Sequence, residues 1–235
     1  MFFKNDQADK VHEEEKQIPS TKEEMVREFK NRLQHSLDLM VKNEGLGITL
    51  LYIETLIDKK VLHQDIISQI KNGAYQSIDT VMDRITVGDV RKSKNLDEAI
   101  KSTLSGSVII HLDGELSVLL VKIPSSESRS LTKSENESQV IGSQIAFNES
   151  LATNITLIRR YIADPNLCNE MFHVGSRTHT AVSMLYVKGI ANEELVTNLR
   201  RRITNIKIDA IIVSTYLSQL NLENCCRLRI TKFLI

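Results

Sequence analysis

The chain is poor in the residues that build covalent frameworks and metal sites, since its 235 residues include three Cys, three Pro and no Trp. Three cysteines cannot form a disulfide framework, and no Cys and His spacing resembles a zinc site. An excess of one charge is also lacking, because 30 Lys and Arg balance 30 Asp and Glu. A general nucleic-acid-binding protein usually carries a basic excess, so the composition argues against nucleic acid as a partner.

Long apolar runs are absent as well. Runs such as Val118–Val121 are short and are broken by charged residues, whereas a membrane span needs about 20 apolar residues. The N-terminus, Met1-Phe2-Phe3-Lys4, is followed by acidic residues and not by the apolar stretch of about 7–15 residues that a signal peptide requires. The sequence therefore predicts a soluble, cytosol-facing polypeptide.

Recognisable catalytic motifs are missing. The chain contains none of the patterns GxSxG, GxxxxGK[ST], HExxH and GxGxxG, which mark nucleophilic, phosphate-binding, zinc and dinucleotide sites. We therefore predict no catalytic residue, no metal site, no cofactor and no enzymatic activity. Cys225 and Cys226 are adjacent and so are awkward partners for an ordinary disulfide, which favours packed or surface thiols over a redox-active pair.

What the chain does contain is a hydrophobic content of 41%, which excludes wholesale disorder. Acidic and Ser-rich stretches with few apolar residues separate two regions of periodic apolar residues, so the length suits two small domains. The predicted segments are a disordered tail over 1–19, an α/β subdomain over 20–123, a Ser-rich linker over 124–140, a second α/β subdomain over 141–220 and an atypical C-terminal tail over 221–235.

In the first subdomain, Ser20 followed by Glu23 is typical of a capping box at the start of a helix. The apolar residues of this predicted helix recur every four positions: Met25, Phe29, Leu33 and Leu37. Asp58 and Asn95 are the predicted caps of two further helices, and a short helix is expected over 78–82. Asp113-Gly114 is the strongest hairpin signal. The expected extended segments are 38–42, 48–53, 85–90, 108–112 and 116–123.

In the second subdomain, an apolar stripe predicts a helix over 147–162 that ends before Asp164-Pro165. The stripe consists of Leu151, Ile155, Leu157, Ile158 and Ile162. Asn192 predicts the cap of a later helix. Strands are expected over 171–174, 180–187 and 206–212, and a short helix over 214–220.

Two segments match at an offset of 134 residues: Leu51-Tyr52-Ile53 aligns with Leu185-Tyr186-Val187, and the cap Asp58 with the cap Asn192. Any strand–loop–helix unit shares this apolar pattern, but the match extends to a tyrosine and a cap. We therefore predict two related small α/β subdomains whose sheets are mainly parallel or mixed and are flanked by helices. Tyr52 and Tyr186 are expected to end equivalent strands with partly buried rings.

The helix after the linker carries the polar residues of most interest. Asn154 borders its apolar stripe, and Arg159 lies about 140° further around the helix, facing solvent or a second body. The ordinary role of such an Asn is a hydrogen bond to a neighbouring loop carbonyl. The basic pair Arg159-Arg160 could be a solvated surface or a contact for an acidic partner or for phospholipid head groups.

The second half resembles the GerA family, the A subunits of bacterial spore germinant receptors. The resemblance is carried by two colinear segments, NESLATNITLIRRYI over 148–162 and GSRTHTAVSMLYVKGIAN over 175–192. It covers roughly residues 141–220, whereas the first half matches more loosely. Gly142-Ser143 stands where the family usually has Gly-Pro. After Leu220 the chain departs from the family's course into a transmembrane half, so we expect a truncated product or a fragment.

The resemblance implies the soluble N-terminal region of a germinant receptor A subunit that takes part in sensing nutrient germinants and in signalling spore germination. It implies partnership with B and C subunits in the spore inner membrane, with this region on the cytoplasmic (core) side and a transmembrane half that the chain lacks. A small-molecule site would lie in the cleft between the subdomains. The implied ligand-binding or interface residues are Glu149, Asn154, Arg159, Arg160 and Tyr186. The alternative is a structural module that scaffolds the receptor complex without binding ligand.

Overall fold

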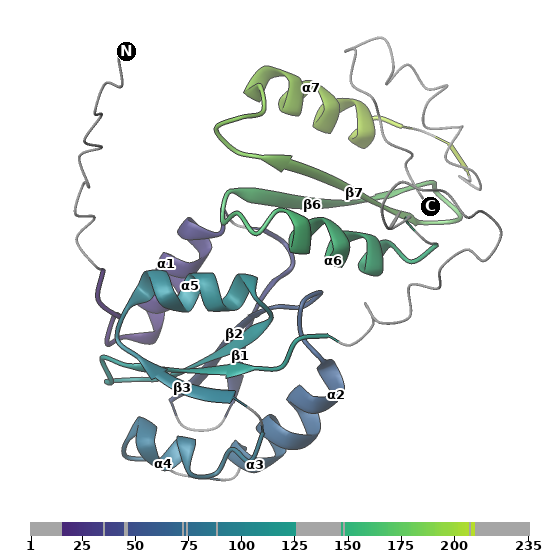
Figure 1. Ribbon diagram of the computed structural model, residues 1–235. Helices are drawn as coiled ribbons and strands as arrows, with labels where there is room; N and C mark the ends of the chain where they lie inside the picture. The colour runs from purple at the N-terminus through teal and green to yellow at the C-terminus, as the bar shows by residue number, and fades with distance from the viewer. Residues whose placement is uncertain are drawn as a thin grey trace, which may run out of the picture.

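The computed structural model describes residues 16–34, 36–44, 47–71, 73, 75–87, 89–125, 147, 149–206 and 208–209. These residues form two α/β units, which we call the first unit (16–125) and the second unit (149–209) (Figure 1). The short helix expected over 214–220, the C-terminal tail and most of the expected linker lie outside the described residues. Within the described part of the chain, no helix combines the length and the apolar content that a membrane span requires.

The first unit is built around a five-stranded sheet in the order β1-β2-β4-β5-β3. Strands β2 and β4 are mostly apolar and are buried along their whole length, as expected of strands inside the sheet. The strands are β1 (Leu39–Glu44), β2 (Ile48–Ile53), β3 (Asp89–Ser93), β4 (Ser107–Leu112) and β5 (Val118–Lys122).

Helices cover both faces of this sheet (Figure 1). On one face, residues such as Ile66, Ile70 and Val81 pack into a core with the strands. On the other face, Phe29 and Ile100 pack into a second core. The helices of the first face are α2 (Lys59–Val61), the π-helical η1 (Leu62–Ile67), α3 (Ser68–Ile70) and α4 (Ile78–Met82), and those of the second are α1 (Lys22–Arg32) and α5 (Leu96–Leu104).

The second unit places an antiparallel hairpin between two helices (Figure 1). Its elements are α6 (Leu151–Tyr161), β6 (Leu167–Val174), β7 (Thr180–Val187) and α7 (Glu193–Thr204). Helix α7 covers one face of the hairpin through Val196 and Ile203, which pack against Val174 and Val182. Helix α6 lies on the other side of the hairpin, toward the first unit (Figure 1).

The α/β class is confirmed, but the expected parallel or mixed pairing is wrong, because every strand pair in the described residues is antiparallel. The physical reason is connectivity. Three of the pairs, β1–β2, β4–β5 and β6–β7, are joined by short turns, and a short turn reverses the chain direction. No helix in the described residues links two adjacent parallel strands, so the alternation of strand and helix signals along the sequence was misleading.

The matched segments have the same order of elements. Five residues separate Ile53 from the start of α2 at Lys59, and five separate Val187 from the start of α7 at Glu193. Both predicted caps are confirmed, since the side chains of Asp58 and Asn192 accept hydrogen bonds from backbone N–H groups of the first helical turn. Their sheet contexts differ, because β2 has two neighbours and β7 has one. A common origin of the two units stays a prediction.

The expected capping box at Ser20 is wrong. Helix α1 begins at Lys22 after Thr21, whose side chain makes no capping hydrogen bond. The cap comes from the hairpin turn instead, since the Asp113 carboxylate accepts from the Lys22 N–H at 3.0 Å. Leu37, expected on the apolar face of this helix, lies beyond its end and is 59% exposed. The extended segment expected over 85–90 is also displaced, because strand β3 spans Asp89–Ser93.

The predicted tail over 1–19 does not include residues 16–19. Ile18 is 1% exposed within the core beside α1 and α5, and its N–H donates to the Lys94 carbonyl at 3.1 Å. A single apolar residue in an acidic stretch gives no periodic signal, so this anchor was invisible in the sequence.

The same anchoring segment covers a buried histidine. His111 is 0% exposed, and its Nε2 lies 3.0 Å from the Pro19 carbonyl oxygen. Because a carbonyl only accepts, Nε2 carries the proton and Nδ1 is bare, and Nδ1 has no partner among the described residues. Burial lowers the pKa of His111 below its ordinary value of 6.5, since a charged ring would lose its hydration.

This histidine predicts an acid-sensitive fold. Above about pH 6.5 the ring is neutral in both states, so its contribution to stability is fully present. As pH falls below the unfolded pKa toward the lowered folded pKa, the unfolded chain binds the proton first and stability is lost. We expect the urea midpoint to drop between pH 7.5 and 5.5, and to drop less in His111→Gln. The exposed His63→Gln variant should retain the full drop, and an equal drop in all three proteins would contradict the assignment.

Candidate functional site

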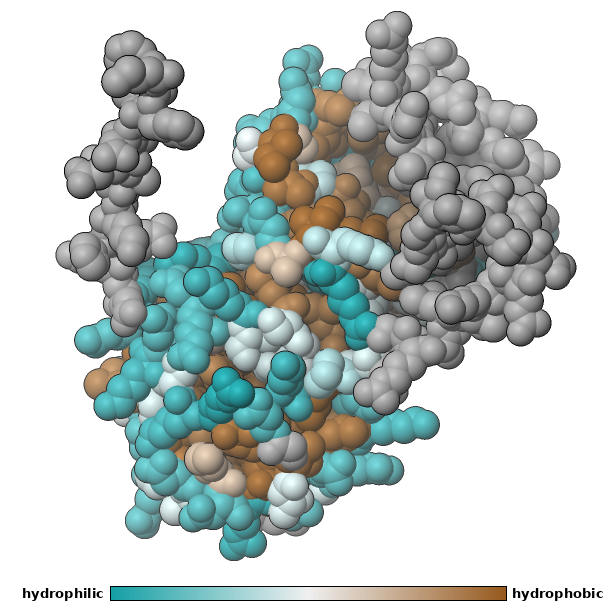
Figure 2. All heavy atoms as spheres, in the orientation of Figure 1, coloured by the Kyte–Doolittle hydropathy of each residue, from teal (hydrophilic) through white to brown (hydrophobic). Residues whose placement is uncertain are grey.

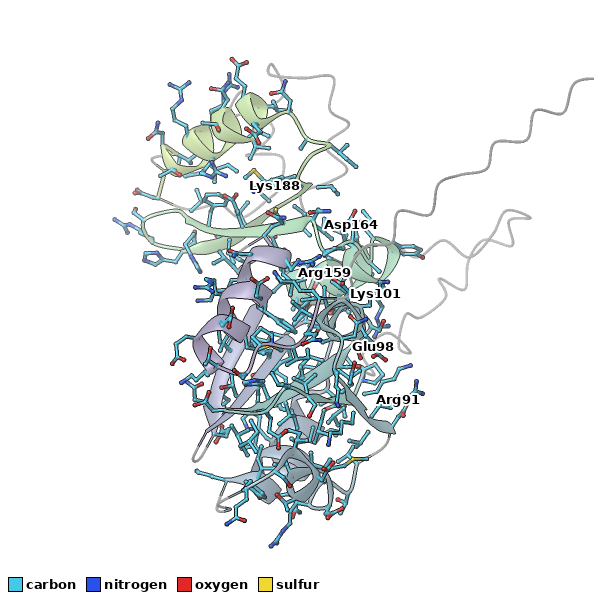
Figure 3. All side chains as sticks on the ribbon, turned by 90° about the vertical axis from the view of Figure 1, so that its left-hand side faces the viewer. Arg91, Glu98, Lys101, Arg159, Asp164 and Lys188 are labelled. Atoms are coloured by element: carbon cyan, nitrogen blue, oxygen red, sulfur yellow. The ribbon has the colours of Figure 1, made fainter. Side chains whose placement is uncertain are left out.

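A buried ion pair joins the two units. Arg159 of α6 donates from Nε to Asp38 Oδ2 at 2.5 Å and from Nη2 to Asp38 Oδ1 at 2.7 Å, although the two residues are 121 positions apart. The Arg159 side chain is 1% exposed and that of Asp38 is 5% exposed. Figure 3 shows Arg159 where α6 meets the first unit. Two parallel bonds to one carboxylate fix the direction of the guanidinium plane as well as its position.

Local structure explains why these two side chains meet. The Ser150 hydroxyl accepts from the Thr153 N–H at the start of α6, and Arg159 lies on the buried side of this helix together with Ile155. Asp38 directly precedes β1, and its carbonyl accepts from the Glu54 N–H at 2.9 Å, which ties it to the end of β2. Each partner therefore also has contacts within its own unit.

Ser36 links the ion pair to the hairpin of the second unit. Its hydroxyl oxygen accepts from Arg159 Nη2 at 2.7 Å and from the Asn169 N–H at 3.0 Å. The Leu37 N–H then donates to the Asn169 carbonyl at 3.2 Å. We call Ser36, Asp38, Arg159 and Asn169 the seam cluster, because these four buried polar residues connect the loop before β1 with α6 and β6.

Three further hydrogen bonds cross between the units at the edges of the seam cluster. Gln34 Nε2 donates to Asn166 Oδ1 at 3.1 Å, and Thr156 Oγ1 donates to the Thr55 carbonyl at 2.7 Å. The third joins Arg160 Nη2 to the Ser125 carbonyl at 2.7 Å. Polar contacts of this kind are sensitive to geometry, so they specify one arrangement of the two units.

A second charged network lies on the opposite face of the hairpin, toward α7. The Tyr186 hydroxyl donates to Glu170 Oε1 at 2.8 Å, and Arg200 donates to both oxygens of the same carboxylate at 2.8 and 2.6 Å. The Arg200 guanidinium holds the pKa of Glu170 below its usual value. Burial, followed by the bond to Glu170, raises the pKa of the Tyr186 phenol, so the ring stays protonated and acts as a donor.

The structure places the five predicted site residues in three different settings. Arg159 and Asn154 are buried on α6, and Arg159 faces the first unit and not solvent. Arg160 and Glu149 are exposed, with Arg160 bonded to the first unit. Tyr186 is half-buried, as expected of its ring, but it belongs to the α7 face of the hairpin. Whether any of them contacts a ligand stays a prediction.

The partners of these residues were missed at the level of sequence. Ser36 fell within the predicted first helix and Asp38 at the start of an expected extended segment, while Asn169 and Glu170 fell just before the strand expected over 171–174. Polar residues in a strand interrupt its alternation of apolar residues, and the adjacent Asn169 and Glu170 interrupt it in β6. No local pattern pairs residues 121 positions apart.

A pocket of about 250 Å³ lies in the first unit, between α5 and strands β3, β4 and β5. Its lining comes entirely from the first unit, so it is not the expected cleft between the subdomains. The seam cluster is by contrast filled by its own side chains, which are nearly inaccessible to solvent.

Comparison with protein families gives one match that spans most of the chain. The model of the Bacillus/Clostridium GerA spore germination protein family matches residues 27–228. The chain is 30% identical over 211 residues to spore germination protein GerQA of Bacillus cereus, and 29% identical over 218 residues to spore germination protein KA of Bacillus subtilis (strain 168). These alignments cover 88% and 91% of the chain but 42% and 38% of the relatives, so the chain spans about two fifths of their length.

Among solved structures, the fold is similar to the N-terminal domain of the A subunit of the Bacillus megaterium spore germinant receptor GerK3. The TM-score is 0.67 at 26% sequence identity, and the match covers 89% of this chain and 81% of that domain. The fold described above therefore has a counterpart in a crystal structure over most of its length.

Breaking the buried ion pair of Arg159 and Asp38 should destabilise the fold far more than breaking an exposed ion pair. Removing one partner leaves the other as an uncompensated buried charge, which costs roughly 3–5 kcal/mol. We therefore expect Asp38→Asn or Arg159→Gln to lower the free energy of unfolding by about that amount in a urea titration. The control is the exposed pair of Lys59 and Glu54, for which Lys59→Gln should cost at most about 1 kcal/mol. Similar small losses in all three variants would show that the seam is solvated.

Proposed function

The chain belongs to the Bacillus/Clostridium GerA spore germination protein family, and we propose that it supplies the N-terminal region of a germinant receptor A subunit. In this role it takes part in sensing nutrient germinants and in signalling spore germination. The observation that carries the proposal is the seam cluster, in which one buried ion pair connects two separately built units. The likeness to the N-terminal domain of a germinant receptor A subunit supports the same assignment.

The seam suits a signalling element because a buried ion pair is either made or broken. A small displacement of α6 would separate Arg159 from Asp38 and leave two charges without water or partner, so intermediate arrangements are unfavourable. The two units therefore strongly prefer the arrangement in which the ion pair is formed. A ligand or partner that binds one arrangement better than another shifts the population between the arrangements. Germinant binding or subunit contact would act through that preference.

Partners and location follow from the proposed role. The chain would associate with B and C subunits at the spore inner membrane, with this region on the cytoplasmic (core) side and the membrane-spanning part of the A subunit outside the chain. Figure 2 shows apolar side chains gathered on the visible face over the second unit. Tyr161 and Ile190 of this unit are 69% and 83% exposed, and exposed large apolar residues are typical of surfaces that contact a partner.

A second candidate, a scaffold that binds no ligand, is favoured by one observation. The residues of the seam cluster bond one another and are nearly inaccessible to solvent, which leaves little access for a small molecule there. In that case the seam would only hold the shape of the region that other subunits recognise.

Germination of spores that carry the full-length receptor separates these candidates. Arg159→Lys keeps the positive charge but loses the two-pronged contact with Asp38, so we expect about a tenfold higher germinant concentration for half-maximal germination, the effect of about 1.4 kcal/mol. Arg201→Lys on the exposed side of α7 is the matched control and should respond normally. Receptor abundance is measured in parallel by immunoblot.

Normal germination of Arg159→Lys spores with normal receptor abundance would rule out a signalling role for the seam. Loss of the receptor together with the response would instead assign the seam a folding role, as the scaffold candidate requires.

A further inference from the structure

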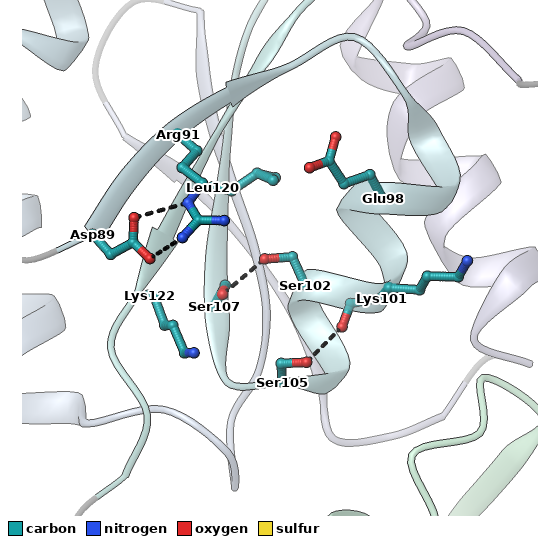
Figure 4. Close-up of a pocket in the computed structure, with 9 residues that line it drawn as sticks. All are labelled: Asp89, Arg91, Glu98, Lys101, Ser102, Ser105, Ser107, Leu120 and Lys122. Carbon is teal, nitrogen blue, oxygen red and sulfur yellow. Dashed lines mark hydrogen bonds and ion pairs between the residues drawn. The ribbon is translucent and has the colours of Figure 1, made fainter.

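The pocket between α5 and the edge of the sheet has an unusual lining for a site beside a hydrophobic core. Two charged residues of the edge strand, Asp89 and Arg91, face it, together with Lys122 of β5 and the hydroxyl groups of α5 and β4 (Figure 4). The complete lining is Asp89, Arg91, Glu98, Lys101, Ser102, Ser105, Ser107, Leu120 and Lys122.

The sheet register builds the floor of this pocket. Lys122 of β5 is opposite Asp89 of β3 on one side and opposite Ser107 of β4 on the other, so three polar residues lie in one row across three strands. In the next row on the same face, Leu120 is opposite Arg91. Side chains alternate between faces along a strand, which puts both rows on the side of the sheet that α5 covers.

The periodicity of α5 builds the wall. Its apolar residues cover the central strands, while four other residues recur at the three- and four-residue spacing of a single helix face: Glu98, Lys101, Ser102 and Ser105. This face overhangs the edge of the sheet, because β3 is the last strand and carries polar residues toward the helix. The pocket therefore forms because polar residues occupy positions that would face the hydrophobic core if the sheet were larger.

The pocket lining holds more hydrogen-bond donors than acceptors. Arg91 uses Nε and Nη2 to bind Asp89, at 2.9 and 2.8 Å, and its third nitrogen points into the pocket (Figure 4). The Lys122 ammonium has no hydrogen-bond or ion-pair partner within the described ranges. Ser102 and Ser107 share one hydrogen bond of 2.8 Å between two hydroxyl groups, so one hydroxyl hydrogen is left for another acceptor.

The two carboxylates of the lining have partners other than Lys122. Both oxygens of Asp89 accept hydrogen bonds from Arg91, and Glu98 accepts a hydrogen bond from the Ser93 hydroxyl. Lys101 turns its amine away from the other cations (Figure 4), and the Ser105 hydroxyl donates to the Lys101 carbonyl. The donors that remain in the lining are the Lys122 ammonium, the third nitrogen of Arg91 and the hydroxyl hydrogen of Ser107. Ammonium, guanidinium and hydroxyl donors that line one pocket match the oxygens of a carboxylate or phosphate group.

We propose that this pocket binds a small organic anion, with the carboxylate or phosphate oxygens held by Arg91, Lys122 and Ser107 and an apolar part resting on Leu120. A volume of about 250 Å³ equals that of roughly eight water molecules at about 30 Å³ each, which limits the ligand to the size of a simple metabolite. The site lies in the first unit, so it goes beyond the proposed signalling role of the seam and does not depend on it.

Titrations of the ¹⁵N-labelled chain with sodium phosphate and, separately, with sodium acetate test the site at constant ionic strength. We expect saturable shifts of the backbone amide signals over residues 105–107 and 120–122, and the stronger of the two salts distinguishes a phosphate from a carboxylate ligand. Lys122→Gln should weaken the fitted affinity by about tenfold, a typical loss for one charge-assisted hydrogen bond. Lys101→Gln, whose amine points away, should change it by less than about twofold.

The proposal is overturned if the shifts grow linearly without saturation, or if they persist unchanged in Lys122→Gln. It is also overturned if Lys101→Gln and Lys122→Gln weaken binding equally, because that result would indicate general attraction of anions to a basic surface and not a site. Arg91→Gln provides an independent variant, and it too should weaken binding by about tenfold if the third guanidinium nitrogen contacts the anion.

Discussion

The arrangement of this molecule depends on the burial of one arginine. Arg159 is the largest fully buried side chain in the described part of the chain, and a guanidinium is stable there only if its charge and its donors are satisfied. Asp38 and Ser36 satisfy it from the first unit. Helix α6 is consequently held against the loop before β1, and the hairpin that follows α6 is held in turn by the contacts of Asn169. Polar complementarity, and not a continuous apolar core, joins the two units.

Local structure could largely be predicted from the sequence, because its causes are local. The caps Asp58, Asn95 and Asn192 are confirmed, since a capping side chain bonds the backbone only two or three residues away. The Asp113-Gly114 hairpin is confirmed for the same reason, with Gly114 at a φ of +91°, a conformation that glycine adopts at little cost. Helix α4 was expected over the residues that it occupies.

Structure that depends on distant residues could not be predicted in this way. The N-terminus of α1 takes its cap from Asp113, which the local Ser20 signal could not indicate. The sheet is antiparallel throughout because its two hairpins and β3 lie side by side in that direction, and packing decides which strands become neighbours. In the candidate site, the sequence left open whether Arg159 faces solvent or a second body, and it gave no sign of Asp38 as the partner. Pairing across the units is a property of the folded chain alone.

The central claim is that the seam cluster holds the two units of this GerA-family chain as one body. Residual dipolar couplings of the backbone amides in a weakly aligned sample measure this most directly, because they report the relative orientation of the units. The account predicts that one alignment tensor fits the first and second units together in the unaltered chain, and that Arg159→Ala requires two tensors while each unit keeps its own internal fit. If the unaltered chain already required two tensors, or if Arg159→Ala were still described by one, the buried ion pair would not be what holds the units together.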